Sequence, residues 1–205
     1  MFPLLVATRN PHKTREFAQI LAPEFACSDL SAAEGFPEVE ETGVTFQENA
    51  GLKAVAASRL VPGLVIADDS GLEVAALGGA PGIYSARYAG EGASDAENVA
   101  KLLEELRVIP SDDTGRAARF CCAIAVAHGG AIIDTYVGFV DGVIGAAPRG
   151  EGGFGYDPVF IPSGYEETFA ELGDGIKNAI SHRAAALTLL KANLPHLRGS
   201  LGRGA

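Results

Sequence analysis

The first residues whose types suggest chemistry follow an apolar run at 4–7. They read Thr8-Arg9-Asn10-Pro11-His12-Lys13. Asparagine is a favoured helix N-cap and proline is preorganised for the first helical position, so a helix is predicted to begin here. Its backbone N–H groups, together with the Thr8 hydroxyl and the Lys13 ammonium, would form an anion-binding site. A capped helix with solvated basic residues is the alternative for this segment taken alone.

Two pairs of adjacent carboxylates form a second group. Asp68 and Asp69 follow an apolar run, and Glu40 and Glu41 lie in an acidic, irregular stretch. Adjacent carboxylates at a strand end repel each other unless a cation relieves the repulsion. Mg²⁺ sites use one or two carboxylates together with waters and substrate phosphates. The pairs are therefore candidate metal ligands, although Asp69 capping a turn beside solvated glutamates explains them equally well.

Aromatic and further basic residues complete the set. Phe154-Gly155-Tyr156-Asp157 offers two rings on a glycine-containing loop, and stacking on one base contributes about 1–3 kcal/mol. A second basic cluster consists of Lys177, His182 and Arg183. The alternatives are that the rings belong to the core and that the basic residues form an exposed helix face. Together, the four segments supply what a metal–nucleotide complex requires.

The elements predicted to position these residues are those of an α/β protein. Short apolar runs predict strands at 4–7 and 64–67. The Val, Ile, Phe, Tyr and Thr content of 119–127 and 131–140 predicts a hairpin with its turn at 128–130. A strand that ends at 67 would place the two aspartates just beyond it.

Helices are predicted between and after these strands. The spacings Thr45 to Glu48 and Ser94 to Glu97 are typical of capping boxes. Helices are therefore predicted over residues 45–60, 94–110 and 177–194. Because no repeat or linker divides the chain, one domain is predicted over 1–198, followed by a flexible tail at 199–205.

The composition limits the class of protein. The chain has 205 residues and a net charge of −10, with 47% hydrophobic and 20% charged residues, which is typical of a folded protein. The acidic balance argues against a nucleic-acid surface but not against a small phosphorylated substrate. No apolar stretch reaches the ~20 residues of a membrane helix, and the N-terminus lacks the basic region of a signal peptide. The three clustered cysteines indicate no disulfide framework, so a cytoplasmic protein without nucleic-acid or membrane partners is predicted.

One glycine pattern resembles a dinucleotide-binding motif without its context. Gly150-x-Gly152-x-x-Gly155 has the required spacing. That motif works between a strand and a helix whose N-terminus faces a pyrophosphate. Here the glycines lead into the segment 157–162, which begins Asp-Pro and ends in proline and cannot form that helix. A dinucleotide site is therefore not predicted.

Two other functions remain open from the residues alone. Ser70, His182 and a neighbouring aspartate could form a hydrolytic triad, but the glycine of a nucleophile elbow is missing two residues before Ser70. A metal-free esterase using Ser70 is one alternative to metal-assisted hydrolysis. A non-catalytic nucleotide sensor is the other.

Seven segments together resemble the inosine triphosphate pyrophosphatase family, also called dITP/XTP pyrophosphatases. They span roughly residues 4–192 in the order found in that family: Ala7-Thr8-x-Asn10 through Lys13 and Glu16, Glu40-Glu41-Thr42-Gly43, Thr45-Phe46-x-Glu48-Asn49-Ala50, Ala67-Asp68-Asp69-Ser70-Gly71-Leu72, Leu77 through Tyr88, Gly152 through Pro158, and Ala179-Ile180-Ser181-His182-Arg183.

The resemblance implies a fold and an activity. The fold would be a long mixed central β-sheet flanked by helices, in two lobes around a substrate cleft, usually as a homodimer. The activity would be Mg²⁺-dependent hydrolysis of ITP, dITP and XTP to the monophosphate and pyrophosphate, which keeps these nucleotides out of DNA and RNA.

The resemblance also implies roles for individual residues. Glu40 and Asp69 would hold the metal, with Glu41 and Asp68 as further candidates, and Asp69 would be the general base. Beyond the resemblance, we predict a metal-assisted attack of water on the α-phosphorus in which Lys13 and Lys53 offset charge on the leaving group. The substrate would contact the remaining residues of the pattern: Thr8, Arg9, Asn10, Pro11, His12, Lys13, Ser70, Phe154, Gly155, Tyr156, Asp157, Lys177, His182 and Arg183.

One segment departs from the family pattern. Arg9 and His12 stand where glycine is common. Glycine there would allow the backbone to approach a phosphate closely. The two cationic or titratable side chains would instead add contacts of their own, so the roles of Thr8, Asn10 and Lys13 carry over more directly.

Overall fold

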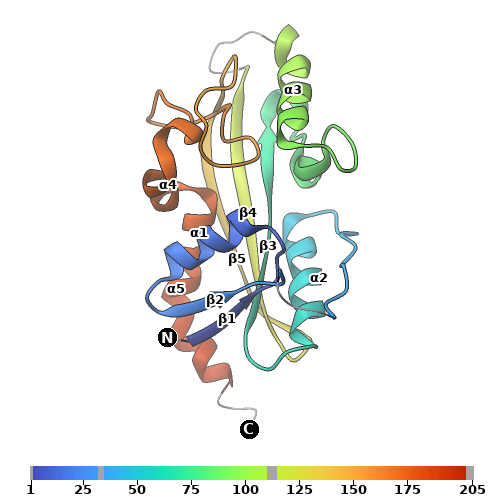
Figure 1. Cartoon of the computed structure of the whole chain (residues 1–205), viewed down its shortest axis with the longest axis vertical. Coiled ribbons are helices and arrows are strands. Elements are labelled where there is room, and N and C mark those ends of the chain that lie inside the picture. Colours follow the sequence, from blue (N-terminus) through green and yellow to red (C-terminus); the bar gives the residue numbers. More distant parts are fainter. Residues whose placement is uncertain (1, 32–34, 110–114, 202–205) are drawn as a thin grey trace. The chain divides into compact units, whose positions relative to one another are not determined.

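The protein, described by a computed structural model, has a six-stranded β-sheet at its centre (Figure 1). The model describes residues 2–31, 35–109 and 115–201, with side chains up to residue 193. The strand order is β2-β1-β3-β4-β5-β6. The bounds are β1 Phe2–Val6, β2 Phe25–Ser28, β3 Val65–Val74, β4 Ala117–His128, β5 Ala131–Ile144 and β6 Phe160–Pro162. Strand β1 runs parallel to β2 and β3, whereas β5 and β6 are antiparallel, so the predicted mixed sheet is confirmed.

Helices α1, α2 and α3 begin where local capping chemistry predicts, whereas the start of α4 was not predicted. The α-helices are α1 Pro11–Leu21, α2 Phe46–Ser58, α3 Asp95–Glu105, α4 Phe169–Ile180 and α5 His182–Leu201, and short 3₁₀ helices cover Ala75–Leu77, Gly82–Arg87 and Leu106–Val108. Asn10 caps α1, and Ser94 and Glu97 form a complete capping box at α3. At α2 the Thr45 side chain accepts the Glu48 N–H as predicted, but the Glu48 carboxylate accepts from Val44 instead of Thr45. No described helix is long and apolar enough to cross a membrane.

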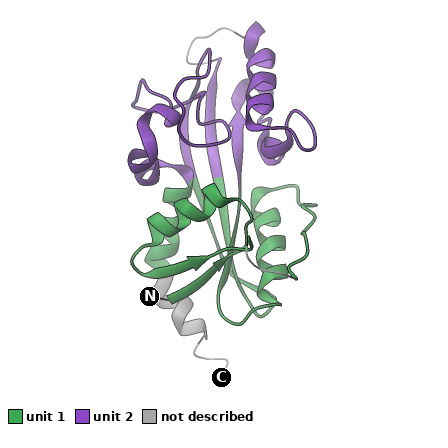
Figure 2. Ribbon diagram, viewed as in Figure 1, with its two compact units in different colours: residues 1–69, 122–138, 183–205 green, residues 70–121, 139–182 purple. Residues whose placement is uncertain are grey.

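The chain forms two compact units (Figure 2). Unit 1 combines residues 1–69, 122–138 and 183–205, and unit 2 combines 70–121 and 139–182. Each has its own core. The core of unit 1 is mainly aliphatic, including Ile66, Ile124 and Leu187, whereas that of unit 2 contains the packed rings of Phe160 and Phe169. The single-domain interpretation of 1–198 stays a prediction.

Two predicted element boundaries are wrong. Strand β3 does not end at residue 67 but continues to Val74, so Asp68 and Asp69 lie inside a strand. The last helix is not continuous from 177 to 194, because Ser181 adopts an extended conformation and separates α4 from α5. Strands β2 and β6 were not predicted, since each has only three or four residues.

The ends of two other predicted segments meet residues that the structure leaves undescribed. Helix α3 ends at Glu105, and the predicted end near Pro110 lies outside the described residues. Helix α5 continues to Leu201 into the predicted tail, and residues 202–205 also lie outside them. The predicted hairpin is confirmed, because β4 and β5 are neighbours joined through Gly129 and Gly130.

Candidate active site

The two adjacent aspartates of β3 have different partners, because successive side chains of a strand point to opposite faces. Asp69 binds Lys53 of α2, with 2.9 Å between Oδ1 and Nζ. The same Nζ lies 2.8 Å from Glu41 Oε1. Asp68 instead binds Lys13 and Arg183. The cations needed to relieve the repulsion between the two carboxylates are thus lysine and arginine side chains, and the direct partners of the two aspartates differ.

Burial sets the electrostatics around Asp69. Removal from water raises the pKa of its carboxyl, and the neighbouring Lys53 ammonium offsets this only in part. Burial alone would lower the pKa of Lys53, but the carboxylates of Asp69, Asp68 and Glu41 outweigh it and raise the pKa. The ammonium thus stays protonated beside a carboxylate with an increased affinity for a proton.

Asn49 connects the acidic loop to Asp69. It is fully buried in α2, its Nδ2 donates to Asp69 Oδ2 at 3.4 Å, and its Oδ1 accepts the Gly43 N–H at 2.8 Å. A Cβ at Gly43 would lie 2.6 Å from Asn49 Oδ1, so only glycine permits this approach. The residue that contacts the cluster from this loop is Glu41, while Glu40 is exposed.

Asp68 belongs to a buried ion network. Lys13 Nζ lies 3.0 Å from Asp68 Oδ2, and Arg183 Nη2 lies 2.9 Å from the same atom. Arg183, which is 0% exposed, also binds Glu16 of α1. Burial alone would raise the pKa of Asp68, but Lys13 and Arg183 hold it well below its usual range. The charge of Arg183 is therefore used to hold Asp68 and Glu16.

The start of α1 is a self-capped helix in this structure. Asn10 Oδ1 accepts the N–H groups of His12 at 2.9 Å and of Lys13 at 3.4 Å, and Thr8 Oγ1 accepts the N–H of Asn10. Arg9 donates to the Phe36 carbonyl, and His12 is exposed. Two N–H groups of the predicted anion site are thus bonded to Asn10. The predicted helix start is confirmed, whereas phosphate binding there stays a prediction.

In unit 2, the predicted base platform is a loop fixed by a side chain of its own, Asp157, and by contacts from neighbouring helices. The Asp157 carboxylate accepts the Phe154 N–H at 2.8 Å and pairs with Lys177 of α4. The Lys177 ammonium also lies 4.4 Å from the centre of the half-buried Phe154 ring. A Cβ at Gly153, whose φ is +74°, would overlap the Asp157 carboxylate, so glycine is needed there. Phe154 is thus the less buried of the two aromatic rings of this loop, and contact with a base stays a prediction.

Two other predicted substrate residues lie in the core of unit 2. Tyr156 is 3% exposed, and its hydroxyl donates to the Ser85 carbonyl at 2.9 Å. The ring of His182 stacks on Phe120, with 4.8 Å between ring centres. Ser70 is the half-buried first residue of this unit. The alternative of a core aromatic therefore describes Tyr156, but not Phe154.

The described residues allow a metal site made of few protein ligands. None of their His, Cys, Asp and Glu side chains gather in threes or more around a common point. Mg²⁺, however, needs only one or two carboxylates when waters and substrate phosphates complete its coordination. Glu41 and Asp69 face one cation, the Lys53 ammonium, and so form such a pair. The donor set fits Mg²⁺ bound together with a phosphorylated ligand.

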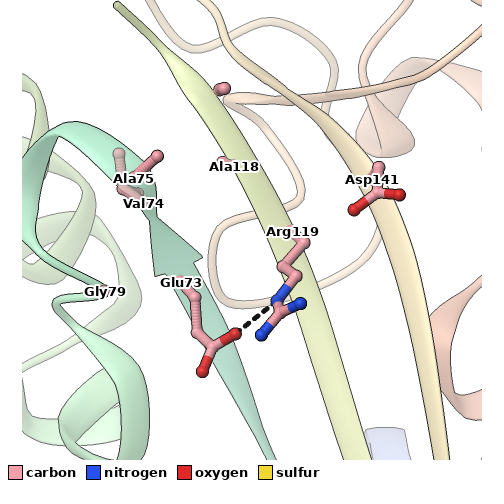
Figure 3. Close-up of a pocket in the computed structure, with 8 residues that line it drawn as sticks. Glu73, Val74, Ala75, Gly79, Ala118, Arg119 and Asp141 are labelled. Carbon is pink, nitrogen blue, oxygen red and sulfur yellow. Dashed lines mark hydrogen bonds and ion pairs between the residues drawn. The ribbon is translucent and has the colours of Figure 1, made fainter.

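A shallow groove of about 380 Å³ in unit 2 is lined by none of the predicted site residues (Figure 3). Glu73, Arg119 and Asp141 contribute its charged groups. Arg119 Nε donates to Glu73 Oε2 at 2.6 Å, and the guanidinium lies 4.7 Å from the Phe139 ring centre. Glu73 and Arg119 thus neutralise each other, and Asp69 with its partners stays the better candidate site.

Known proteins resemble this chain over nearly its whole length. The chain matches the Ham1 family over residues 4–193, which is nearly its whole length. The chain belongs to the Ham1 family. It is 52% identical to the dITP/XTP pyrophosphatase of Geobacillus kaustophilus, covering 99% of each protein. It is 51% identical to the dITP/XTP pyrophosphatase of Bacillus subtilis, covering 91% of this chain and 93% of the relative.

Solved structures of Ham1 proteins share the fold. The Staphylococcus aureus Ham1 protein matches with a TM-score of 0.81 and 43% identity, covering 95% of this chain and 98% of the other. The Coxiella burnetii protein matches with a TM-score of 0.83 and 41% identity, covering 96% and 100%. The α/β fold and the family predicted from the sequence are thus confirmed.

Sequence reasoning missed two buried polar residues of this Ham1 chain. Asn49 and Glu16 were part of the quoted family segments but received no role. Asn49 holds the acidic loop beside Asp69, and Glu16 holds Arg183. The available signal was a polar residue among the apolar positions of a helix, since Glu16 precedes the buried Phe17 and Asn49 precedes the buried Ala50.

Proposed function

We propose that this chain hydrolyses the deaminated purine nucleoside triphosphates ITP, dITP and XTP to the monophosphate and pyrophosphate. The observation that carries the proposal is the buried Asp69, which faces Lys53 and Glu41 in a chain of the Ham1 family. Relatives at about half identity over nearly the full length are named dITP/XTP pyrophosphatases, which supports the same activity here. Removing these triphosphates would keep them out of DNA and RNA.

The triphosphate is assigned to the cations of unit 1. Lys13 and Lys53 each lie beside one aspartate of β3, at 3.0 and 2.9 Å. An incoming triphosphate would share these ammonium groups and so spread its charge over both. Thr8 and the Asn10-capped helix start are proposed as further phosphate contacts, since a phosphate oxygen can replace the Asn10 side chain at the N–H groups of α1.

Glu41 and Asp69 are the proposed ligands of Mg²⁺, with Glu40 as a second candidate from the same loop. Bound Mg²⁺ would supply charge neutralisation at the phosphates. The protein's own part is to hold the carboxylates still. Asn49 does so by bonding both the Asp69 side chain and the backbone of the acidic loop. Asp68 is proposed not as a ligand but as the anchor of Lys13.

Asp69 is proposed as the general base. Its Oδ atoms would accept a proton from the water that attacks the α-phosphorus, and pyrophosphate would leave with charge offset by Lys13 and Lys53. Burial raises the pKa of the Asp69 carboxyl, and a carboxylate with a raised pKa takes up a proton more readily. Phosphoryl-type transfer depends on positioning and charge more than on covalent chemistry, which suits this set of residues.

The base of the nucleotide is assigned to the loop of unit 2. The Phe154 ring offers stacking, and hypoxanthine and xanthine present an acceptor oxygen at C6 where adenine has a donor amine. A site built to donate to that oxygen would leave the adenine amine unpaired and so reject it. His182 and backbone N–H groups are the proposed donors, and the N–H groups of Phe154 and Gly155 are not among them because Asp157 and Asp95 accept them. Arg183 is proposed to act through Asp68, because it is buried and bound there.

The proposal also includes a homodimer, as the family resemblance implies, and a cytoplasmic location, as the composition predicts. Light scattering of the purified protein tests the dimer, since it gives the mass in solution directly. A monomeric mass at micromolar concentration would contradict the proposed homodimer and leave the proposed hydrolysis unaffected.

The activity is tested by measuring pyrophosphate release from ITP, dITP, XTP, GTP and ATP, each with Mg²⁺ and with EDTA. We expect release from the first three, little from ATP, and none in EDTA. Release that persists in EDTA and is lost on Ser70→Ala would support the metal-free esterase. Binding of ITP without release would support the sensor, and equal rates on ATP and ITP would contradict the proposed selectivity.

A further inference from the structure

The loop of residues 152–157, called the base loop from here on, has a contact with helix α3, to which the proposed function gives no role. Asp95 is the first residue of α3, and its Oδ2 accepts the N–H of Gly155 at 2.6 Å. Both residues belong to unit 2, and the contact spans 60 positions of sequence. A hydrogen bond to a carboxylate is roughly twice as strong as one between neutral groups. The loop is thus held by a charge from outside its own segment.

The helix does not need this carboxylate for its own cap. Ser94 accepts the Glu97 N–H, and Glu97 in turn accepts from the Ser94 backbone, so the capping box is complete without Asp95. Glu97 also places a negative charge in the first turn, where it interacts favourably with the helix dipole. Asp95 is therefore available for the loop.

Local packing does not fix the backbone at Gly155, the residue that Asp95 binds. Gly155 has φ of +62°, and a Cβ there would meet open space, so local packing leaves this residue room to move. On one side of it, the Phe154 N–H is bonded to Asp157, and on the other, the Tyr156 hydroxyl is bonded to Ser85. The Asp95 carboxylate adds a hydrogen bond at Gly155, which lies between the two aromatic residues.

The same turn of α3 holds a neighbouring segment. Asn98 is 2% exposed, its Nδ2 donates to the Ala86 carbonyl at 3.2 Å, and its Oδ1 accepts the Ala89 N–H at 2.7 Å. These bonds fix the end of the 3₁₀ helix that contains Ser85, the acceptor for Tyr156. The first turn of α3 is therefore a rigid support on which Asp95 stands.

We propose that Asp95 is a positioning residue for nucleobase recognition: its carboxylate holds Gly155, and through it the Phe154 ring, in the conformation that contacts the base. The inference rests on the proposed function, because it assigns the loop to the base of the substrate. Its consequence is that Asp95 controls the binding of the base and leaves phosphate binding and the chemical step unchanged.

The test compares Asp95→Ala with Asp95→Asn, which keeps an acceptor oxygen, and with Glu104→Ala, which removes an exposed carboxylate further along the same helix. For Asp95→Ala we expect KM for ITP to rise about 10-fold, since a charge-assisted hydrogen bond is lost, with kcat nearly unchanged. Asp95→Asn should recover most of this loss. Inhibition by inorganic triphosphate, which has no base, should be the same in all variants.

A second measurement reads the contact without turnover. Amide hydrogen exchange at residues 152–157 should be about 10-fold faster in Asp95→Ala than in the wild type and unchanged in Glu104→Ala. Equal KM values in the two alanine variants, or a parallel loss of inhibition by inorganic triphosphate, would overturn the proposed role. A wild type that hydrolyses no ITP would instead contradict the proposed function, and hydrogen exchange would then decide alone whether Asp95 holds the loop.

Discussion

The two units differ in how far their buried charges are connected. In unit 1 they form a network: Asp68 and Arg183 are 2% and 0% exposed and bind each other directly, and Lys13 and Glu16 join them. In unit 2 the base loop has one buried ion pair, Asp157–Lys177, and its other side-chain contacts go to the backbone, as those of Asp95 and Tyr156 do. Unit 1 thus arranges several charges, and unit 2 mainly fixes the shape of a loop.

This difference separates the two tasks that the proposed reaction requires. Ion pairs buried in a strand keep their charges in fixed places, which suits the binding of phosphates and the activation of water. A loop with glycines at 153 and 155 and one half-buried ring can fit a flat base. Changes in unit 1 should therefore act on kcat and on stability, and changes in the loop of unit 2 should act on KM.

The largest effect is expected at Asp69. Asp69→Asn keeps the shape of the side chain but cannot accept a proton, so kcat for ITP should fall by about 10²–10⁴-fold while the melting temperature changes little. The measurement is steady-state pyrophosphate release. Asp141→Asn, which alters a carboxylate of the unit 2 groove, is the matched control and should keep wild-type activity. Turnover near that of the control would remove Asp69 from the mechanism.

A second prediction compares ion pairs of the two units. Asp68→Asn leaves Lys13 and Arg183 with too little negative charge in a buried place, and the free energy of unfolding should fall by about 3–5 kcal/mol. Glu73→Gln breaks the Arg119 pair, whose arginine is half exposed, and should cost at most about 1 kcal/mol. Denaturant titration measures both. Similar losses would mean that the networks do not differ in the way proposed.

The smallest effect is expected at the loop ring. Phe154→Ala removes the stacking surface, so KM for ITP should rise about 5–100-fold, as stacking on one base contributes about 1–3 kcal/mol, with kcat nearly unchanged. Phe139→Ala, at an exposed ring of the same unit, is the control. A fall in kcat with constant KM would mean that Phe154 contributes to the chemical step, as the charges of unit 1 do, and would contradict the proposed difference between the units.

Local chemistry made part of the fold predictable from the sequence. The cap at Asn10 and the capping box at Ser94 depend on residues within four positions of each other, and both are confirmed. The hairpin through Gly129 and Gly130 was predictable for the same reason. The break at Ser181 was not, because α4 and α5 continue one helical composition across it.

The residue types of the site were predictable from the sequence, but the ion pairs between its side chains were not. Asp68 and Asp69 were expected beyond a strand, because an Asp-Asp-Ser-Gly run is typical of a turn. The strand continues because each carboxylate meets a cation from a distant segment, and Arg183 lies 115 positions from Asp68. Such partners follow from the tertiary fold and not from any local pattern. The separate partners of Asp68 and Asp69 therefore required the structure.

The division of unit 1 into three chain segments has a consequence during synthesis. The last segment begins at Arg183 and carries Leu187 and Leu190 of the core as well as the guanidinium that binds Asp68. Domains commonly fold as they emerge, from the N-terminus onward. Here the first 69 residues emerge long before the helix that completes their core. Unit 1 can therefore complete its core only after α5 has been synthesised, and the apolar side chains of its first segment lack part of their packing until then.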